Sequence, residues 1–485
     1  MKRVFSLQSS VFAALMLSAG PLAAQEPITL ARAIELAQQQ GYQARAAAAT
    51  REAARYRDRA FYSRLMPQIS VGGFLPQYNR SIIQVLQPDG STLFRPQDQV
   101  NATMSMTLSQ RLPLTGGEFF VTSSLARLQL SGQQSSRTYS STPVLFGLRQ
   151  DLRRPNASGW DRREQPIRSE VAERQYLEAR EDVAIQTAAL FFDAYAARVA
   201  LNNATKNAAV NDTLYTLNKG RYEVGRIGEN DLLQSELALL RARTSLDGAR
   251  LEQDRAMAAL RLALNLPATE PLEIMVVSSV PEFEADTARA VVEALKNRAS
   301  VSDVELQEIQ SRRRVTEAKL ASGIGATIQA SYGYNATGPE ASQAYENLQE
   351  ARAFSLSLSV PLLQWGSHKE TVRAAEADRD RVVNQGRSTL EQTAQDAHFA
   401  ALQLSQARRN LTLSAKGDTV AAKRFEVALN RYVIGRITID NLYVAQNEKD
   451  QALSNFVQAL RGYWQAYYRL RRLTLYDFAA GEQIR

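Results

Sequence analysis

The chain has 485 residues and a formal charge of +8 at neutral pH, and 45% of its residues are hydrophobic. That hydrophobic share is typical of a folded protein rather than a disordered one. Cysteine is absent, which excludes disulfides, thiol catalysis, thiolate metal sites and lipidation of an N-terminal cysteine. The positive charge could indicate nucleic-acid binding, but the arginines are scattered among acidic residues as on solvated helix faces, so we expect no nucleic-acid partner.

The first predicted element is a signal peptide over residues 1–24. A short basic start precedes the apolar run 11–20, and small residues follow at Ala23 and Ala24. The run is too short to span a bilayer, and the layout is that of a cleaved secretory signal. We expect cleavage after Ala24, and a secreted chain.

Long helices are predicted for most of the remaining chain. Apolar residues recur there at spacings of three and four, with few Gly or Pro. These patterns cover residues 28–65, 160–219, 229–265, 286–321, 367–430 and 438–476. A helix of about 60 residues is about 90 Å long at 1.5 Å per residue, which no ordinary globular domain needs. No segment after the signal offers about 18 continuous apolar residues, so no transmembrane helix is expected.

Segments that alternate apolar and polar residues separate the helices. We expect strands at 69–80, 102–110, 118–130, 144–152, 327–335 and 354–360. A single segment of this kind also fits a soluble sandwich, but several in a secreted chain favour a barrel wall. The connection around residues 113–117 is short, and we expect longer polar connections around 81–99 and 131–142.

Several short sequences occur twice. "RYEVGRIGENDLL" begins at Arg221 and "RYVIGRITIDNLY" at Arg431, and "TLARAIELA" at Thr29 is echoed by "DTARAVVEAL" at Asp286. "LSQRLPLTGG" before the first long helix likewise corresponds to "LSVPLLQWGS" before the second. The order of helix, strands, long helix, turn and helix therefore occurs twice, and each short helix should be about 37 residues long.

Two glycines mark the predicted reversals of the chain. Gly225 and Gly435 occupy the same place in the two copies of the motif. Glycine accepts the positive φ that the residue after a helix often needs. We therefore expect a tight turn at each, with strands at the opposite end of the helices.

The duplicated plan, the signal peptide and the paired Arg-Tyr-x-x-Gly-Arg-Ile motifs resemble the TolC family of outer-membrane efflux proteins over nearly all of the mature chain. The resemblance implies a mixed α/β membrane protein: a homotrimer whose outer-membrane β-barrel continues as a long periplasmic α-helical barrel. It also implies a passive duct for efflux or secretion rather than an enzyme, embedded in outer-membrane lipid and partnered by a periplasmic adaptor and an inner-membrane transporter. On this plan the first repeat covers residues 25–270 and the second 271–485.

The sequence departs from the family in its strands. A typical first half has two, whereas we predict four in the first half and two in the second. Six strands per chain would give an 18-stranded trimeric barrel. The alternative is the usual four strands per chain, 12 in the trimer, with an additional hairpin to one side.

The resemblance also assigns roles to the turns, which would form the periplasmic tip. The residues implied to dock the adaptor are Gly225, Arg226, Ile227, Gly435, Arg436 and Ile437. The residues implied to line or lock the periplasmic aperture are Tyr222, Asp231, Tyr432, Asp440 and Asn441.

Simpler structural roles remain open for the same residues. Asn230, Asp231 and Thr438 suit a helix N-terminus, the tyrosines could pack on their neighbours, and Arg226 and Arg436 could balance the negative end of a helix dipole. The guanidinium fork also suits an adaptor carbonyl or carboxylate.

The sequence shows little that points to catalysis. Neither His368 nor His398 has a second His nearby or a carboxylate at metal-ligand spacing in the sequence, and neither a phosphate-binding loop nor a Gly-x-Ser-x-Gly elbow occurs. We expect no catalytic residue, metal or cofactor. A periplasmic adaptor or coiled-coil structural protein without a pore is the alternative function, although such a protein should lack duplicated barrel strands. The exported substrate is left open.

Overall fold

The computed structural model describes residues 27–86, 88–131, 135–267, 272–276, 280–321 and 323–484. The predicted signal peptide, its cleavage site and the predicted boundary between the repeats at residue 270 lie outside the described residues. In chain order the principal elements are α1 (Leu30–Gln40), α2 (Tyr42–Arg64), β1 (Gln68–Leu86), β2 (Thr92–Arg111), β3 (Glu118–Ser131), β4 (Ser136–Asp151), α3 (Ala157–Glu223), α4 (Glu229–Leu264), α5 (Thr287–Asn297), α6 (Ala299–Ala321), β5 (Gly325–Gly338), η1 (Gln343–Tyr345), β6 (Gln349–Ser359), α7 (Ser367–Val433), α8 (Ile439–Thr474), β7 (Tyr476–Asp477) and β8 (Glu482–Gln483).

The two halves of the chain have matching helices, which confirms the repeat. The long helices α3 and α7 have 67 residues each, and α4 and α8 have 36 each. The shorter pairs also match, with 23 residues in α2 and α6 and 11 in α1 and α5. None of the described helices carries a stretch long and apolar enough to cross a membrane.

The prediction of single helices over 28–65 and 286–321 is wrong, because each is broken into a short and a longer helix. The breaks lie at Gly41 and Arg298, whose backbones are extended with ψ of 147° and 143°. In both cases the amide of the break residue still donates to a carbonyl four residues earlier. At Gly41 a Cβ would lie 2.5 Å from the Ala37 carbonyl oxygen, so this break favours glycine. The apolar spacing continues through both breaks, and so it did not reveal them.

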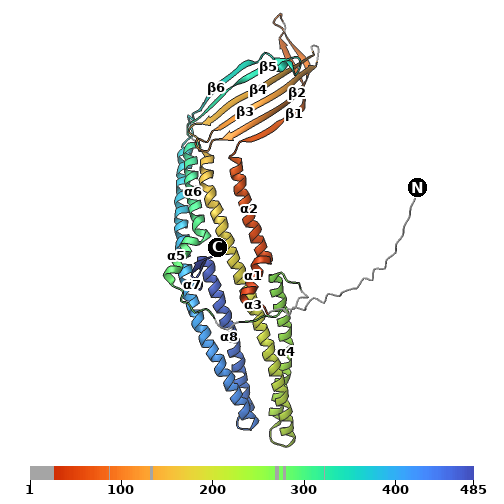
Figure 1. Cartoon of the computed structure of the whole chain (residues 1–485), viewed down its shortest axis with the longest axis vertical. Coiled ribbons are helices and arrows are strands. Elements are labelled where there is room, and N and C mark those ends of the chain that lie inside the picture. The colour runs from red at the N-terminus through yellow and green to blue at the C-terminus, as the bar shows by residue number, and fades with distance from the viewer. Residues whose placement is uncertain are drawn as a thin grey trace, which may run out of the picture. The chain divides into compact units, whose positions relative to one another are not determined.

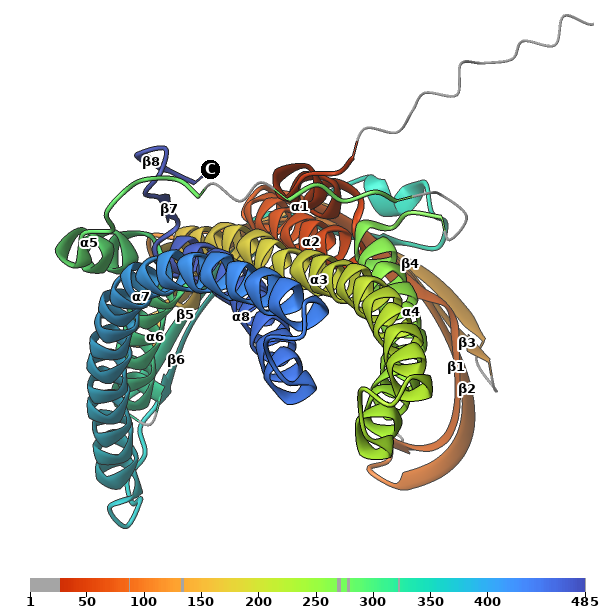
Figure 2. The same ribbon diagram turned by 90° about the horizontal axis from the view of Figure 1, so that it is seen from below.

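The chain divides into two compact units. Within the described residues, the helical unit comprises 27–41 and the described parts of 186–280 and 417–461, and it includes both helix–turn–helix motifs. The sheet unit comprises residues 42–185, 281–416 and 462–485, and includes all six long strands. Figure 2 gives a second view of these elements.

The long strands form one antiparallel sheet in sequence order, from β1 to β6 (Figure 1). Four precede α3 and two follow α6, as predicted. The pairing of β4 with β5 joins the two repeats, and β1 and β6 are the edges of the sheet.

The long polar connections predicted around 81–99 and 131–142 are wrong. β1 continues to Leu86, β2 begins again at Thr92, and β4 begins at Ser136. These residues pair across the hairpins, for example Ile82 with Pro96 and Leu128 with Thr138. Turn-favouring and polar residues such as Pro88, Asp89, Gly90 and Ser91 lie within these segments, and the composition therefore resembled a loop.

The register places apolar side chains on one face of all six strands. Ile69 and Val71 of β1 lie opposite Leu108 and Met106 of β2, and the row continues across the sheet. Its other members are Val121, Phe146, Leu148, Ile328, Tyr332, Phe354, Leu356 and Leu358. The opposite face is rich in Ser and Thr, including Thr103, Ser105, Thr107, Thr122, Ser331, Ser355 and Ser357.

Many side chains of the apolar face are exposed, including Ile69, Met106, Phe354 and Leu356. A contiguous exposed apolar face of this kind marks contact with lipid or with another protein.

Candidate functional site: the paired helix turns

The turn between α3 and α4 is a Schellman motif. The Gly225 amide donates to the Tyr222 carbonyl at 2.8 Å, and the Arg226 amide donates to the Arg221 carbonyl at 2.8 Å. These two bonds satisfy carbonyls that the end of a helix leaves without partners. Gly225 has a φ of 73°, a region that residues with a Cβ rarely adopt. The motif Arg-Tyr-x-x-Gly-Arg is thus the sequence of a helix end.

The turn between α7 and α8 repeats this geometry. The Gly435 amide donates to Tyr432 and the Arg436 amide to Arg431, each at 2.9 Å. The φ of Gly435 is 71°. Both predicted reversals are therefore confirmed, with the same cap in each copy.

The two tyrosines of the motif have different environments. Tyr432 is 5% exposed, and its hydroxyl donates to Oδ1 of Asn218 at 2.8 Å. Tyr222 is 42% exposed. Asn218 lies four residues before Tyr222, and the matching position before Tyr432 is Ala428. Only one copy can therefore form this bond, and the Asn-to-Ala difference between the repeats is the sequence signal that could have revealed it.

Arg221 reinforces the link between α3 and α7. Its guanidinium lies over the Tyr432 ring, 5.4 Å from the centroid, and donates to the Val433 carbonyl at 3.0 Å. A cation over an aromatic face is stabilised by the ring quadrupole. The end of α7 is thus held to α3 by a buried hydrogen bond, a cation–π contact and a bond to backbone.

A small apolar core surrounds this link. Leu214 of α3 packs with Tyr432, Ile439 and Leu442, and Ile437 lies partly buried against them. Ile437 is thus already engaged within the chain, and Ile227 is half-buried. The most exposed apolar side chains of the two turns are Val224 and Ile434, which are 70% and 64% exposed. They occupy the unspecified positions of the motif, and the sequence analysis did not select them.

Arg226 and Arg436 are exposed at the turns. Among the described residues neither forms an ion pair within 4 Å. Their guanidinium groups are thus accessible, as a role in contacting a partner requires.

The acidic and amide residues after the turns are spread over several environments. Asp440 accepts a 2.6 Å bond from the amide of Gln234, and Asn441 donates to Thr438 Oγ1 at 3.0 Å. Asp231 is half-buried in the first turn of α4, where a carboxylate suits the positive end of the helix.

Neither Asn230 nor Asp231 is the N-cap of α4, a structural role that the sequence left open for them. Gly228 is the N-cap, and it makes no side-chain capping bond. Asn230 and Asp231 instead lie inside the first turn, because the helix begins at Glu229.

A polar cavity of about 410 Å³ lies beside the link, between α3, α4 and α8. Three polar atoms at its wall are buried without a hydrogen-bond partner among the described residues: Asn211 Oδ1, Tyr443 OH and Gln446 Oε1. Burial raises the pKa of Tyr443 to about 12. A cavity with this volume and several polar groups is suited to holding water. The contact between these helices is therefore partly polar, in contrast to the apolar core at the turn.

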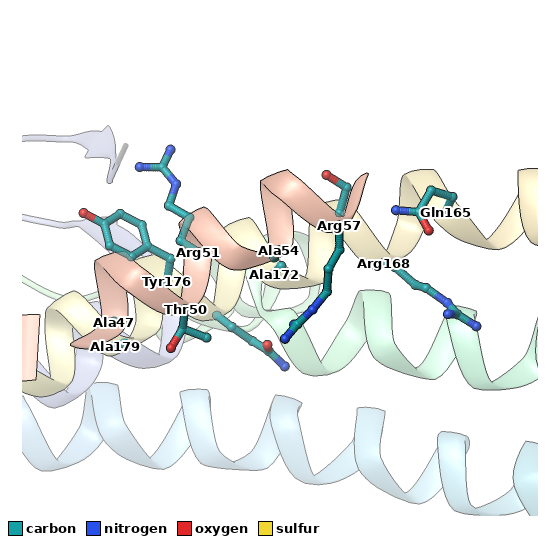
Figure 3. A pocket seen from close by; sticks show the side chains of 12 residues that line it. Ala47, Thr50, Arg51, Ala54, Arg57, Gln165, Arg168, Ala172, Tyr176 and Ala179 are labelled. Atoms are coloured by element: carbon teal, nitrogen blue, oxygen red, sulfur yellow. The ribbon is translucent and has the colours of Figure 1, made fainter. Parts of the chain in front are cut away.

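A second cavity, of about 450 Å³, lies between α2 and α3 in the sheet unit (Figure 3). Alanines on both helices form part of its wall, including Ala47, Ala54, Ala172 and Ala179. Arg51 donates to Glu173 at 2.6 Å and stacks on Tyr176 at 4.5 Å. The charges are largely satisfied by neighbouring helices, so we assign this cavity to helix packing rather than to chemistry.

Within the part of the chain that the structure describes, no group of three His, Asp or Glu side chains could hold a metal ion. His398 packs edge-on against Phe399, with ring centroids 5.5 Å apart.

The comparison with known proteins identifies the fold. The Campylobacter jejuni CmeC outer membrane channel superposes with a TM-score of 0.66 at 15% identity, over 94% of this chain and 86% of that one. VceC of Vibrio cholerae, an outer membrane protein, gives 0.66 at 14% identity over 94% and 97% of the two chains. The open state of the Neisseria gonorrhoeae MtrE outer membrane channel gives 0.63 at 14% identity over 94% and 90%.

The chain has the TolC-like fold. No protein-family model matches the sequence, and no curated protein matches it. At this level of identity the comparison establishes the TolC-like fold alone. The fold class predicted from the duplicated motif, with two repeats of helices and antiparallel strands, is confirmed.

Proposed function

We propose that this TolC-like chain is a passive exit duct of the outer membrane, formed by three copies. The observation that carries the proposal is the six-stranded sheet, with an exposed apolar face, a Ser- and Thr-rich opposite face and two free edges. An open edge cannot face lipid, because its backbone groups would lack hydrogen bonds. Six strands are also too few to enclose a wide pore. Joining β6 of each copy to β1 of the next would close an 18-stranded barrel with its apolar face toward lipid.

The paired turns are proposed to form the periplasmic tip. The Schellman caps bring each turn to a compact end, where Val224, Ile434, Arg226 and Arg436 are accessible. A partner that presents apolar and carbonyl or carboxylate groups would fit these side chains. A periplasmic adaptor that links the duct to an inner-membrane transporter is the partner we propose.

The link between Tyr432 and Asn218 is proposed to hold the tip closed. It joins the helix ends of the two repeats, and the polar cavity beside it provides a less tightly packed contact that can rearrange. Opening would separate α7 and α8 from α3. The acidic residues Asp231 and Asp440 are proposed to lie near the aperture.

The duct is proposed to be passive and without catalytic activity, and its energy would come from the transporter. The sequence has no phosphate-binding loop.

The function is tested by reconstituting the purified mature protein in planar lipid bilayers. We expect discrete conductance steps that persist without nucleotide. The alternative, a periplasmic adaptor or structural protein without a pore, predicts no conductance and release from membranes without detergent. Hydrolysis of ATP above background by the purified protein would contradict a passive duct.

A further inference from the structure

The β1–β2 hairpin extends beyond the rest of the sheet. β1 pairs with β2 as far as Leu86 and Thr92, whereas pairing of β2 with β3 begins only at Asp98. Residues 81–86 and 92–97 therefore form a two-stranded extension that no third strand in the described part of the same chain supports. An isolated two-stranded hairpin is marginally stable in water, so this extension needs another surface.

The extension exposes large apolar side chains. Ile82 is 71% and Leu86 is 72% exposed, and Phe94 is similarly accessible. Arg80, two residues before Ile82 on the same face of β1, lies 3.5 Å from Asp98 and keeps most of its side chain exposed. The surface to be covered is therefore apolar, with the exposed Arg80–Asp98 ion pair at its base.

The lengths of the edge strands indicate what could cover it. β1 has 19 residues and β6 has 11. Both meet the helices at one end of the sheet, since β1 follows α2 and β6 precedes α7 (Figure 1). If β6 of a neighbouring copy pairs with β1 from that end, about eight residues of β1 continue past it. They would then lie beside the β5–β6 connection of that copy, residues 339–348.

That connection carries the complementary groups. Tyr345 and Leu348 are exposed large apolar residues, and Glu346 is exposed beside them. The connection is itself anchored, because Ser141 of β4 donates to the Ala344 carbonyl and Ala344 is buried.

We propose that the outer part of the β1–β2 hairpin docks on the β5–β6 connection of a neighbouring copy, with Ile82 and Leu86 against Tyr345 and Leu348, and Arg80 near Glu346. The contact rests on the proposed closed trimer. It would clamp each junction between copies beyond the paired strands, and it would cover an edge that otherwise invites non-specific pairing.

The chain lacks cysteine, so paired cysteines can be introduced without background cross-linking from native thiols. In outer membranes, the pair Ile82→Cys and Leu348→Cys, treated with a short thiol cross-linker, should convert most of the monomer band to covalent dimers and trimers. The control pair, Val71→Cys and Leu356→Cys, lies on the parts of β1 and β6 near the helices, and it reports only on whether β6 of one copy pairs with β1 of the next. Each single-cysteine variant should remain a monomer on the gel.

The outcomes separate the two proposals. If the control pair cross-links and the hairpin pair does not, the docking proposal is wrong, and lipid or other hairpins cover the extension instead. The proposal of a closed trimer would still stand. If neither pair cross-links in the folded protein, the proposed closed trimer is wrong, and so is the docking, which depends on it. As a second measurement, Arg80→Glu should lower the temperature at which the trimer dissociates in detergent, and adding Glu346→Arg should restore it. Failure of the double variant to recover any of the loss would contradict the pairing.

Discussion

At the scale of single residues, the Tyr432 hydroxyl makes the hydrogen bond that is proposed to hold the tip closed. Its bond to Asn218 is buried on both sides, and a buried acceptor left without a donor costs about 1–3 kcal/mol. Tyr432→Phe removes the donor with little change in shape. We expect a roughly ten-fold shift toward the open state, seen as higher bilayer conductance and greater sensitivity to large antibiotics such as vancomycin.

The repeat supplies the matched control for this variant. Tyr222→Phe changes the same motif at an exposed side chain with no such bond, and it should behave as wild type. Equal conductance in the two variants would show that the link does not hold the tip closed.

A substitution at Gly435 tests whether adaptor docking depends on the backbone conformation of the turn. With a φ of 71° and nothing within 4 Å of an added Cβ, Gly435→Val should be disfavoured by backbone strain of about 1–2 kcal/mol rather than by a clash. We expect weaker binding to the adaptor and reduced efflux, with normal assembly in the outer membrane. Gly417→Ala in α7, also with open space but with no positive φ, should retain binding. If the Gly435→Val protein fails to assemble but still binds the adaptor, the turn is needed for folding and not for docking.

At the scale of elements, the turns present exposed apolar residues, and the most exposed one in the α7–α8 turn is Ile434. Ile434→Asp replaces it by a charge without affecting the buried core, so adaptor capture in a pull-down should fall at least several-fold. Leu413→Asp, at another exposed position of α7, should have no effect. Equal loss in both variants would point to a general effect of charge on the helix rather than to docking.

Packing of α3 against α8 in the sheet unit has a predictable pH dependence. Glu181 of α3 is buried, and burial raises its pKa although Arg471 lies 3.2 Å away. A carboxyl whose pKa is raised on folding costs stability where it is ionised, and the cost disappears as pH falls below its unfolded pKa.

Glu181→Gln removes this titration. The stability of the variant relative to wild type should therefore increase as pH rises from about 4 to 7, as measured by thermal unfolding at several pH values. Glu252→Gln, on an exposed face of α4, serves as the control and should not show this rise. A relative stability that is flat or falls with pH would mean that Arg471 outweighs burial.

The sequence predicted these elements well where one local rule decides the structure. The glycine turns follow from the positive φ of a helix cap, and the six strands follow from alternation. It did not predict the breaks at Gly41 and Arg298, where the apolar spacing continues through the break. It also missed the hairpin extension, whose polar residues resemble a loop. The bond of Tyr432 to Asn218 joins residues 214 positions apart. The difference between Asn218 and Ala428 in the two repeats marks the position but does not identify its partner.

At the scale of the whole molecule, the account depends on the sheet being a third of a closed barrel. The exposed apolar face and the two free edges leave a single chain incomplete in lipid. Three copies of six strands give 18, which is the wider of the two barrels that the sequence allowed. The mass of the assembly therefore tests the central claim most directly.

Native mass spectrometry of the mature protein, extracted from outer membranes in mild detergent, makes that measurement. We predict a single dominant species of three copies that resists dissociation until heated. A stable monomer, or a soluble species obtained from the periplasm without detergent, would contradict the trimeric outer-membrane duct.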